Sequence, residues 1–217
     1  RITERIAEKS VEAALKQIER FQETPGPFFL WLHLFDPHAD YNPPSSFREK
    51  FSDLYDAEVA YTDHCLGHLF GRLQKTGLEE NTIIVVMADH GEGLGEHGEA
   101  SHGYFLYNTT LHIPLIVKAP SVPPSRIAHT VRSIDVMPTV LTLMDIEEKG
   151  MAQGIDLSPW LVNGGTSERF PSCDSYAETH FPHHAFGWRI SRSLTEGRYK
   201  YIDTKKGELY DLAADGR

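Results

Sequence analysis

Helical spacing of apolar residues marks the first part of the chain. In residues 1–23 the apolar side chains share one helical face, and Pro25-Gly26-Pro27 predicts the end of this helix. A second pattern of the same kind runs over 55–76, and Gly77 is suited to end a helix. The apolar side of this second helix is predicted to comprise Tyr55, Val59, Leu66, Leu69, Phe70 and Leu73.

Three apolar runs without regular alternation, 28–35, 83–88 and 113–117, predict strands. The lack of alternation indicates strands that are covered on both faces, as in the central sheet of an α/β protein. A further short strand is predicted over 129–135 and a helix over 136–145, and residues 155–159 are expected to begin another helix.

The pattern changes from about residue 167, where short apolar segments alternate with Gly and Pro. Runs at 175–178, 186–190, 199–202 and 208–211 predict a small antiparallel sheet. We therefore expect two domains, an α/β core over 1–165 and a small antiparallel subdomain over 166–217.

The charge and composition exclude some classes of protein. The net charge of −10 argues against a nucleic-acid partner, because phosphate binding needs clustered Lys and Arg. No apolar run is long enough to predict a membrane span, and no secretory signal opens the chain. Cys65 and Cys173 are expected to be ordinary thiols, since two cysteines do not make a disulfide framework.

Candidate chemistry follows the run 83–88, which ends abruptly in Asp89-His90-Gly91-Glu92. In an open α/β sheet, ligands bind beyond the carboxyl ends of the strands. A carboxylate and an imidazole at that point form part of a plausible divalent-metal site. The glycines that follow leave the loop free of side-chain bulk, so its backbone can approach an anion or a metal ion closely.

These residues carry a family resemblance. The segment ADHGEGLGEHGEASHGYFLYNTTLHIPLIV resembles the sulfatase branch of the alkaline phosphatase superfamily. PFFLWLHLFDPHADYNPP is similar to the segment that holds the family's substrate histidine, and SIDVMPTVLTLMDI, GRYKYI and GELYDL resemble later parts. The resemblance extends from about Glu23 to the end. It implies part of an alkaline phosphatase-like α/β/α sandwich, followed by a small antiparallel β subdomain.

The resemblance also implies roles for individual residues. Asp89 and His90 correspond to metal ligands, and His38 to the histidine that contacts the sulfate or the leaving-group oxygen. His102 occupies a place where relatives often have a sulfate-binding lysine, so His38 and His102 are the predicted catalytic and substrate-binding residues. His97 is a further predicted substrate-binding residue.

The implied cofactor is one divalent metal ion. Calcium is the first expectation from the family, in which the usual ligand pair is Asp-Asn. The Asp-His pair of this chain also admits Mn, Zn or Mg, because imidazole suits transition metals better than calcium. Glu92 and Glu96 are expected to face solvent, with a place behind the metal ligands as the alternative. His180, His183 and His184 are expected to form a surface cluster, with contact to an anionic sugar as the alternative.

The family's nucleophile is a formylglycine made from Cys or Ser in a C/S-x-P/A-x-R motif. Neither Cys65 nor Cys173 lies in such a motif, and the segment 121–126 has one residue too many before Arg126. We therefore expect the nucleophile to lie in an N-terminal half of the same fold, outside this chain. The chain alone is expected to be inactive.

The predicted function is that of a metal-dependent sulfuric ester hydrolase acting on a small-molecule or carbohydrate sulfate ester. Two alternatives stay open. One is a phosphodiester or phosphonate hydrolase, or a phosphoethanolamine-type transferase, of the same superfamily. The other is a non-catalytic, truncated binding domain. The family resemblance implies a periplasmic or secreted protein.

Overall fold

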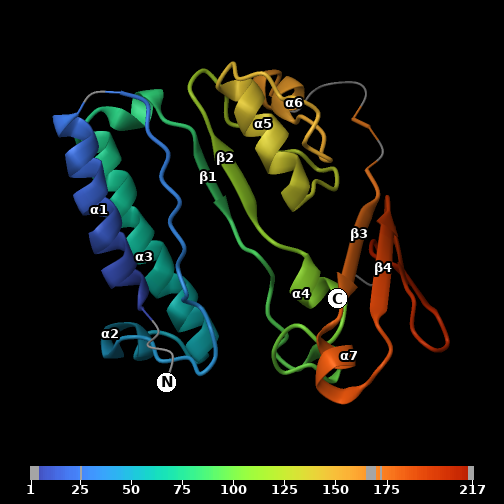
Figure 1. Ribbon diagram of the computed structural model, residues 1–217. Helices are drawn as coiled ribbons and strands as arrows, with labels where there is room; N and C mark the ends of the chain where they lie inside the picture. Colours follow the sequence, from blue (N-terminus) through green and yellow to red (C-terminus); the bar gives the residue numbers. More distant parts are fainter. Residues whose placement is uncertain (1–4, 25, 165–169, 172, 215–217) are drawn as a thin grey trace. The chain divides into compact units, whose positions relative to one another are not determined.

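The computed structural model describes residues 5–24, 26–164, 170–171 and 173–214. It contains both helices and strands, so the chain is of the predicted α/β class. Two compact units, Arg1–Thr82 and Ile83–Arg217, divide the chain. Among the described residues, the first unit contains helices and all the strands belong to the second (Figure 1).

The first unit is built on two long helices that lie side by side. Its elements are α1 (Ala7–Glu23), α2 (Ser45–Arg48), α3 (Leu54–Lys75) and the 3₁₀ helix η1 (Leu78–Asn81). The two helices contact each other, and apolar positions at helical spacing on both are buried and form the core of this unit. The buried apolar side chains are Ala7, Val11, Ala14 and Ile18 on α1, and Ala57, Tyr61, Cys65, Leu69 and Leu73 on α3. Both predicted long helices are confirmed.

Local hydrogen bonds determine where α3 begins and ends. The Asp53 side chain accepts from the backbone N–H groups of Tyr55 and Asp56, so it caps the N-terminus. Gly77 adopts φ 72° just past the helix, which confirms its predicted role at the C-terminal end. The predicted apolar side is partly wrong, because Val59 is 43% exposed and the buried face runs through Tyr61 and Cys65 instead.

The predicted strand over 28–35 is not formed within the described residues. Positions 28, 30, 32 and 34 are half-buried, whereas Phe29 and Trp31 are 80% and 78% exposed. An extended segment becomes a strand only where a neighbour pairs with its backbone groups, and no described residue pairs with this one. The expectation of a strand covered on both faces is therefore wrong here.

In the second unit, the runs at 83–88 and 113–117 form one antiparallel pair. β1 (Ile84–Met87) pairs with β2 (Leu115–Lys118), with Val85 opposite Val117. The strands are confirmed, but neither is covered on both faces, since Met87 is 37% and Ile116 61% exposed. The segment between β1 and β2 contains the 3₁₀ helix η2 (Glu96–Gly98) and the short helix α4 (Asn108–Leu111).

A buried carboxylate organises the helices that follow β2. These are the 3₁₀ helix η3 (Ser133–Asp135), α5 (Val136–Leu143) and α6 (Ser158–Val162). Asp135 is fully buried and accepts from the Arg132 backbone N–H at 2.8 Å, from the Arg132 guanidinium at 2.8 Å and from the Ile155 N–H at 2.9 Å. The helices near 136 and 158 are confirmed. The strand over 129–135 is wrong, because its last three residues form η3 and residues 129–132 belong to no strand.

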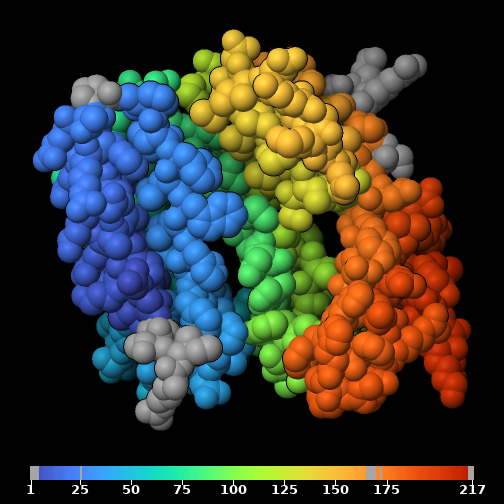
Figure 2. All heavy atoms as spheres, in the orientation of Figure 1, coloured from blue at the N-terminus to red at the C-terminus, as the bar shows by residue number. Residues whose placement is uncertain are grey.

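The chain ends in a four-stranded antiparallel sheet of order β3-β4-β5-β6. Its strands are β3 (Ser175–Thr179), β4 (Ser191–Glu196), β5 (Tyr199–Ile202) and β6 (Glu208–Asp211), with the helix α7 (Phe181–Phe186) between β3 and β4. The predicted sheet is confirmed, although the strand expected at 186–190 is wrong. In Figure 2, α7 adjoins the segment before β2, and the rings of Tyr104 and Phe181 make an edge contact at 5.1 Å.

The predicted domain boundary between 165 and 166 falls on residues 165–169, which lie outside the described residues, and it stays a prediction. Cys65 and Cys173 are buried free thiols, as expected, and burial raises the pKa of each thiol. None of the described helices combines the length and the apolar character that crossing a membrane requires.

Candidate functional site

A glycine-rich loop connects β1 to β2, and we call residues 89–112 the motif loop. Its backbone folds back on itself through three hydrogen bonds from alternate glycines. The N–H of Gly91 donates to Thr110, that of Gly93 to Ser101 and that of Gly95 to Glu99, over 2.8, 2.9 and 2.9 Å. A Cβ at Gly93 would lie 2.6 Å from the Ser101 carbonyl oxygen, so only glycine fits this close approach.

His90 has a defined ring orientation directly after Asp89. Its Nδ1 lies 2.8 Å from the carbonyl oxygen of Gly91, which can only accept, so Nδ1 carries the proton. In the neutral ring Nε2 then holds the lone pair, and it lies 3.8 Å from Oδ1 of Asp89. The two side chains are 41% and 79% exposed. A metal-binding histidine uses this arrangement, with one nitrogen fixed by a carbonyl and the other free of its proton.

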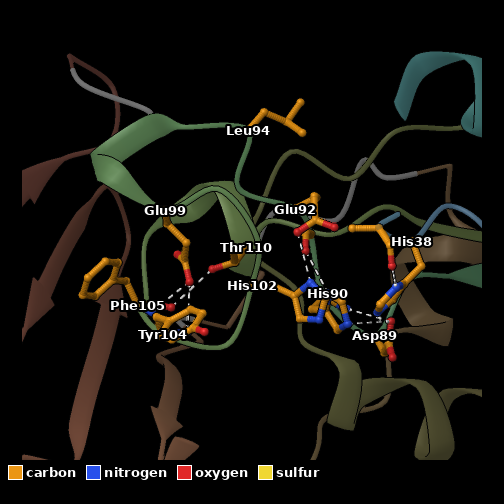
Figure 3. A network of polar contacts seen from close by, with 12 residues as sticks. His38, Asp89, His90, Glu92, Leu94, Glu99, His102, Tyr104, Phe105 and Thr110 are labelled. Carbon is orange, nitrogen blue, oxygen red and sulfur yellow. Dashed lines mark hydrogen bonds and ion pairs between the residues drawn. The ribbon is translucent and has the colours of Figure 1, made fainter. Parts of the chain in front are cut away.

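His102 stacks on His90, with ring centroids 4.0 Å apart and an interplanar angle of 29°. Its Nδ1 lies 3.0 Å from Oε1 of Glu92, whose side chain is only 5% exposed. The Glu92 carboxylate therefore fixes the His102 ring, as the Gly91 carbonyl fixes the His90 ring. Figure 3 shows Asp89, His90, Glu92 and His102 gathered at one place.

Glu92 was expected to face solvent, and that expectation is wrong. The folding back of the loop buries its side chain under His102, which the sequence pattern alone does not reveal. The only signal was its position two residues after His90. Glu96, by contrast, is exposed and accepts from the N–H of Leu94 at 2.9 Å. For Glu92 the structure therefore favours the alternative to solvent exposure, a place behind His102.

A second buried carboxylate supports the far side of the motif loop. Glu99 is 3% exposed, and its Oε1 accepts from the backbone N–H groups of Tyr104 at 2.9 Å and Phe105 at 3.2 Å (Figure 3). These bonds tie the turn after His102 to the turn before it. Glu99 thus stabilises the conformation of the motif loop.

His97 has different neighbours from His90 and His102. Its ring stacks on Tyr107 at a centroid distance of 3.7 Å, and its backbone has φ 53°. The hydroxyls of Tyr107 and Tyr210 both donate to Glu208, over 3.0 and 2.6 Å. The bond from Tyr210 lowers the pKa of Glu208, and burial raises that of Tyr107. The predicted substrate contact of His97 stays a prediction.

His38 belongs to the first unit. Its backbone N–H donates to Oε2 of Glu58 at 3.1 Å, and the N–H of Asn42 donates to the other oxygen. Glu58 is 3% exposed, and burial raises its pKa. A buried carboxylate therefore fixes the backbone turn that carries His38. The predicted approach of His38 to Asp89, which belongs to the second unit, stays a prediction.

The histidines of the C-terminal sheet region lie on the surface. His180, His183 and His184 are exposed, as expected of a surface cluster. His180 lies 3.4 Å from Glu178, and Nδ1 of His183 donates to the Trp188 carbonyl at 2.7 Å. Across the described residues, no group of three or more His, Cys, Asp or Glu side chains is arranged to hold a metal ion. Asp89 and His90 alone are therefore an incomplete ligand set.

Comparison with known proteins places this site in a family. The model of the family described as Sulfatase matches residues 2–146. Arylsulfatase K of Bos taurus is 27% identical over 202 residues, which cover 85% of this chain and 36% of the relative. An N-acetylglucosamine-6-O-sulfatase of Bacteroides thetaiotaomicron is 31% identical over 171 residues, which cover 75% of this chain and 30% of the relative. The chain thus spans about a third of the length of these curated relatives.

Solved structures show the same fold. The protein yidJ of Bacteroides fragilis, solved as a sulfatase candidate, superposes with a TM-score of 0.83 at 22% identity, covering 97% of this chain and 52% of that chain. A phosphonate monoester hydrolase of Agrobacterium radiobacter has a TM-score of 0.80 at 17% identity. The match covers 98% of this chain and 56% of the hydrolase chain. The chain therefore has the same fold as these two proteins. Since the family model covers most of the sequence, the chain belongs to the sulfatase family.

Proposed function

We propose that this chain forms part of a metal-dependent sulfuric ester hydrolase. The observation that carries the proposal is the pair of stacked rings of His90 and His102 beside Asp89, each ring fixed at Nδ1 by an acceptor. Fixed donor and acceptor directions next to a carboxylate suit the binding of an anion together with a metal ion. Membership of the sulfatase family makes a sulfate ester the favoured substrate.

We assign Asp89 and His90 to a divalent metal ion. The donor set fits, since the carboxylate is largely exposed and Nε2 of His90 is the unprotonated nitrogen of the neutral ring. Such an ion, when bound, polarises the sulfate oxygens and lowers the pKa of the nucleophile. The remaining ligands are proposed to come from outside this chain. Calcium is the family's first candidate, and the imidazole ligand also admits Mn, Zn or Mg.

His102 is proposed to bind the sulfate group. With Nδ1 hydrogen-bonded to the buried Glu92, its proton-bearing form directs Nε2–H away from that carboxylate, toward a sulfate oxygen. His38 is proposed to donate a proton to the departing alkoxide or phenoxide, and Glu58 keeps the backbone of its turn in place. His97 is proposed to extend the substrate contact.

The nucleophile is proposed to be a formylglycine in an N-terminal half of the same fold. The favoured substrates are small-molecule or carbohydrate sulfate esters, and the favoured location is the periplasm or the extracellular space. These proposals follow from the family and from relatives such as the N-acetylglucosamine-6-O-sulfatase.

The test uses the protein in which this chain is joined to the proposed nucleophile half. Turnover of an aryl sulfate is measured for wild type, Asp89→Ala, His38→Ala and the control His64→Ala, an exposed histidine on α3. Loss of a metal ligand or of the general acid is expected to lower kcat about 100-fold or more, whereas the control keeps wild-type turnover. If Asp89→Ala and His38→Ala both leave turnover intact, the site assignment is wrong.

A second candidate is a phosphonate or phosphate diester hydrolase of the same superfamily. The Asp-His pair favours it, as does a phosphonate monoester hydrolase from Silicibacter pomeroyi that is 26% identical with a TM-score of 0.62 over 75% of this chain. Turnover of an aryl sulfate is compared with that of an aryl phosphate diester. A higher kcat/KM for the diester selects this candidate. Turnover of neither ester favours the non-catalytic binding domain.

A further inference from the structure

The C-terminal sheet holds the motif loop by three hydrogen bonds that join residues far apart in sequence. The Thr179 hydroxyl donates to the carbonyl of Gly103 at 2.6 Å, directly after His102. The Tyr107 hydroxyl donates to Glu208 of β6, and Nζ of Lys200 on β5 donates to Oδ1 of Asn108 at 2.9 Å. Two of the three bonds therefore involve Tyr107 and Asn108, at the start of α4.

Lys200 is an unusual residue to find at such a contact. It is 2% exposed, and its burial lowers the pKa of the ammonium group to about 8. Burying a cation costs free energy that an apolar side chain of the same length would not cost. Among the described contacts, its hydrogen bond goes to the neutral Asn108 amide and not to a carboxylate. What the lysine adds over an apolar residue is therefore this one directed bond.

α4 transmits its position to the turn that carries the proposed metal ligands. The carbonyl of Thr110, near the end of α4, accepts from the N–H of Gly91 at 2.8 Å. The carbonyl of Thr109 packs so closely against Gly91 that no Cβ fits between them. A shift of α4 must therefore move Gly91, the neighbour of His90, because backbone packed this tightly does not absorb displacement.

We propose that Lys200 is a positioning residue for the reaction: through Asn108 and α4 it fixes the place of the Asp89-His90-Gly91 turn. The inference rests on the proposed function for its kinetic consequence, though its structural part does not depend on which ester is hydrolysed.

The experiment compares four variants of the full protein: Lys200→Met, Asn108→Leu, the double variant, and the control Arg198→Met. Arg198 lies next to β5 and makes an exposed ion pair with Asp211, so its loss changes charge on the same sheet without touching α4. Three quantities are measured: resistance to urea, hydrogen exchange of the Gly91 amide, and kcat with KM.

Asn108→Leu is expected to unfold at lower urea, because it leaves the buried Lys200 ammonium without its partner. The double variant is expected to regain most of that resistance, since both partners are then apolar. We expect Gly91 exchange to be about tenfold faster in Lys200→Met and in the double variant, with β1 amides unchanged. In both, kcat is expected to be about tenfold or more lower, with KM within about threefold of wild type.

Two results overturn the proposal. If the double variant regains kcat together with stability, Lys200 acts through packing alone. If Lys200→Met leaves Gly91 exchange as in wild type or Arg198→Met, α4 does not transmit its position. Failure of the proposed function is distinguishable: wild type would then turn over neither ester, and Gly91 exchange alone would still decide whether Lys200 positions the turn.

Discussion

Gly93 offers a steric test of the motif loop. A Cβ at this position would lie 2.6 Å from the Ser101 carbonyl oxygen and 2.7 Å from the Glu99 carbonyl oxygen. Gly93 is not among the residues with positive φ, so Gly93→Ala adds bulk without adding backbone strain. Ser101 directly precedes His102, and Glu92 directly precedes Gly93. A methyl group here therefore separates the two strands of chain that bring His102 to Glu92.

The required displacement can be worked from these distances. Ordinary van der Waals contact begins near 3.4 Å, so the Ser101 carbonyl must move away by about 0.8 Å. The 2.9 Å hydrogen bond from Gly93 N–H to the same oxygen lengthens with it. Overpacking of this kind costs about 1–3 kcal/mol of folding free energy. A shift of that size at a catalytic side chain can lower turnover by up to about 100-fold.

The assay is urea unfolding together with ester turnover for wild type, Gly93→Ala and the matched control Gly67→Ala. Gly67 lies inside α3, and a Cβ there would meet no atom within 4 Å. Alanine at an open helical position is expected to stabilise by about 1 kcal/mol, because glycine loses more backbone entropy on folding. The same glycine-to-alanine substitution should therefore lower the free energy of unfolding at residue 93 and raise it at residue 67.

One result refutes this reasoning. If Gly93→Ala unfolds at the same urea concentration as wild type or higher, and its turnover is unchanged, the loop accommodates the methyl group. The close backbone approach would then not be the reason for glycine at this position.

Three further predictions concern buried or capping carboxylates. Asp135→Asn turns an amide N–H₂ toward donors that now reach a carboxylate, so it is expected to cost about 2–4 kcal/mol in urea unfolding; an unchanged midpoint contradicts this. Asp53→Ala removes the α3 cap and should cost about 1 kcal/mol, whereas Asp53→Asn should cost less. Burial raises the pKa of Glu58 above the ordinary 4.5, so the stability it contributes is fully present below about pH 4.5 and is lost as pH rises through the raised value. The free energy of unfolding of the wild type relative to Glu58→Gln, measured in urea, should therefore fall as pH rises from about 4.5 through the raised pKa. A rise over this range would contradict the raised pKa of Glu58.

Local patterns predicted the helices of this protein well. α1 and α3 follow from the helical spacing of apolar residues and, for α3, from Gly77 just past its end. The C-terminal sheet was predicted as a whole because short strands and turns alternate there. In both cases the determining interactions are close in sequence.

Strand pairing was harder to predict because it depends on distant partners. Residues 28–35 are as apolar as β1, yet no described segment pairs with them. The run 186–190 has strand-like composition, but Pro182 lies in the first turn of α7 and Gly187 ends that helix at φ 69°, so β4 begins only at residue 191.

The site was predicted in part. Asp89, His90 and His102 could be named because they lie in one motif, and the structure brings them together. Lys200 could not be named, and a buried place for Glu92 was only the alternative to solvent exposure, because the burial of a charged side chain depends on which segments fold over it. Their roles become visible only once the loop and the sheet are in place.

The hydrogen bonds that support the motif loop also determine when, during synthesis, this loop can reach its final structure. Tyr107 and Glu208 are separated by 101 residues, and Lys200 and Asn108 by 92. During synthesis, α4 leaves the ribosome long before β5 and β6 exist. The two helices of the first unit can pack early, whereas the loop with His90 and His102 obtains the supports from Lys200 and Glu208 only when β5 and β6 have emerged. A nascent chain stalled before residue 200 would carry every proposed ligand of this site without the contacts that hold them in place.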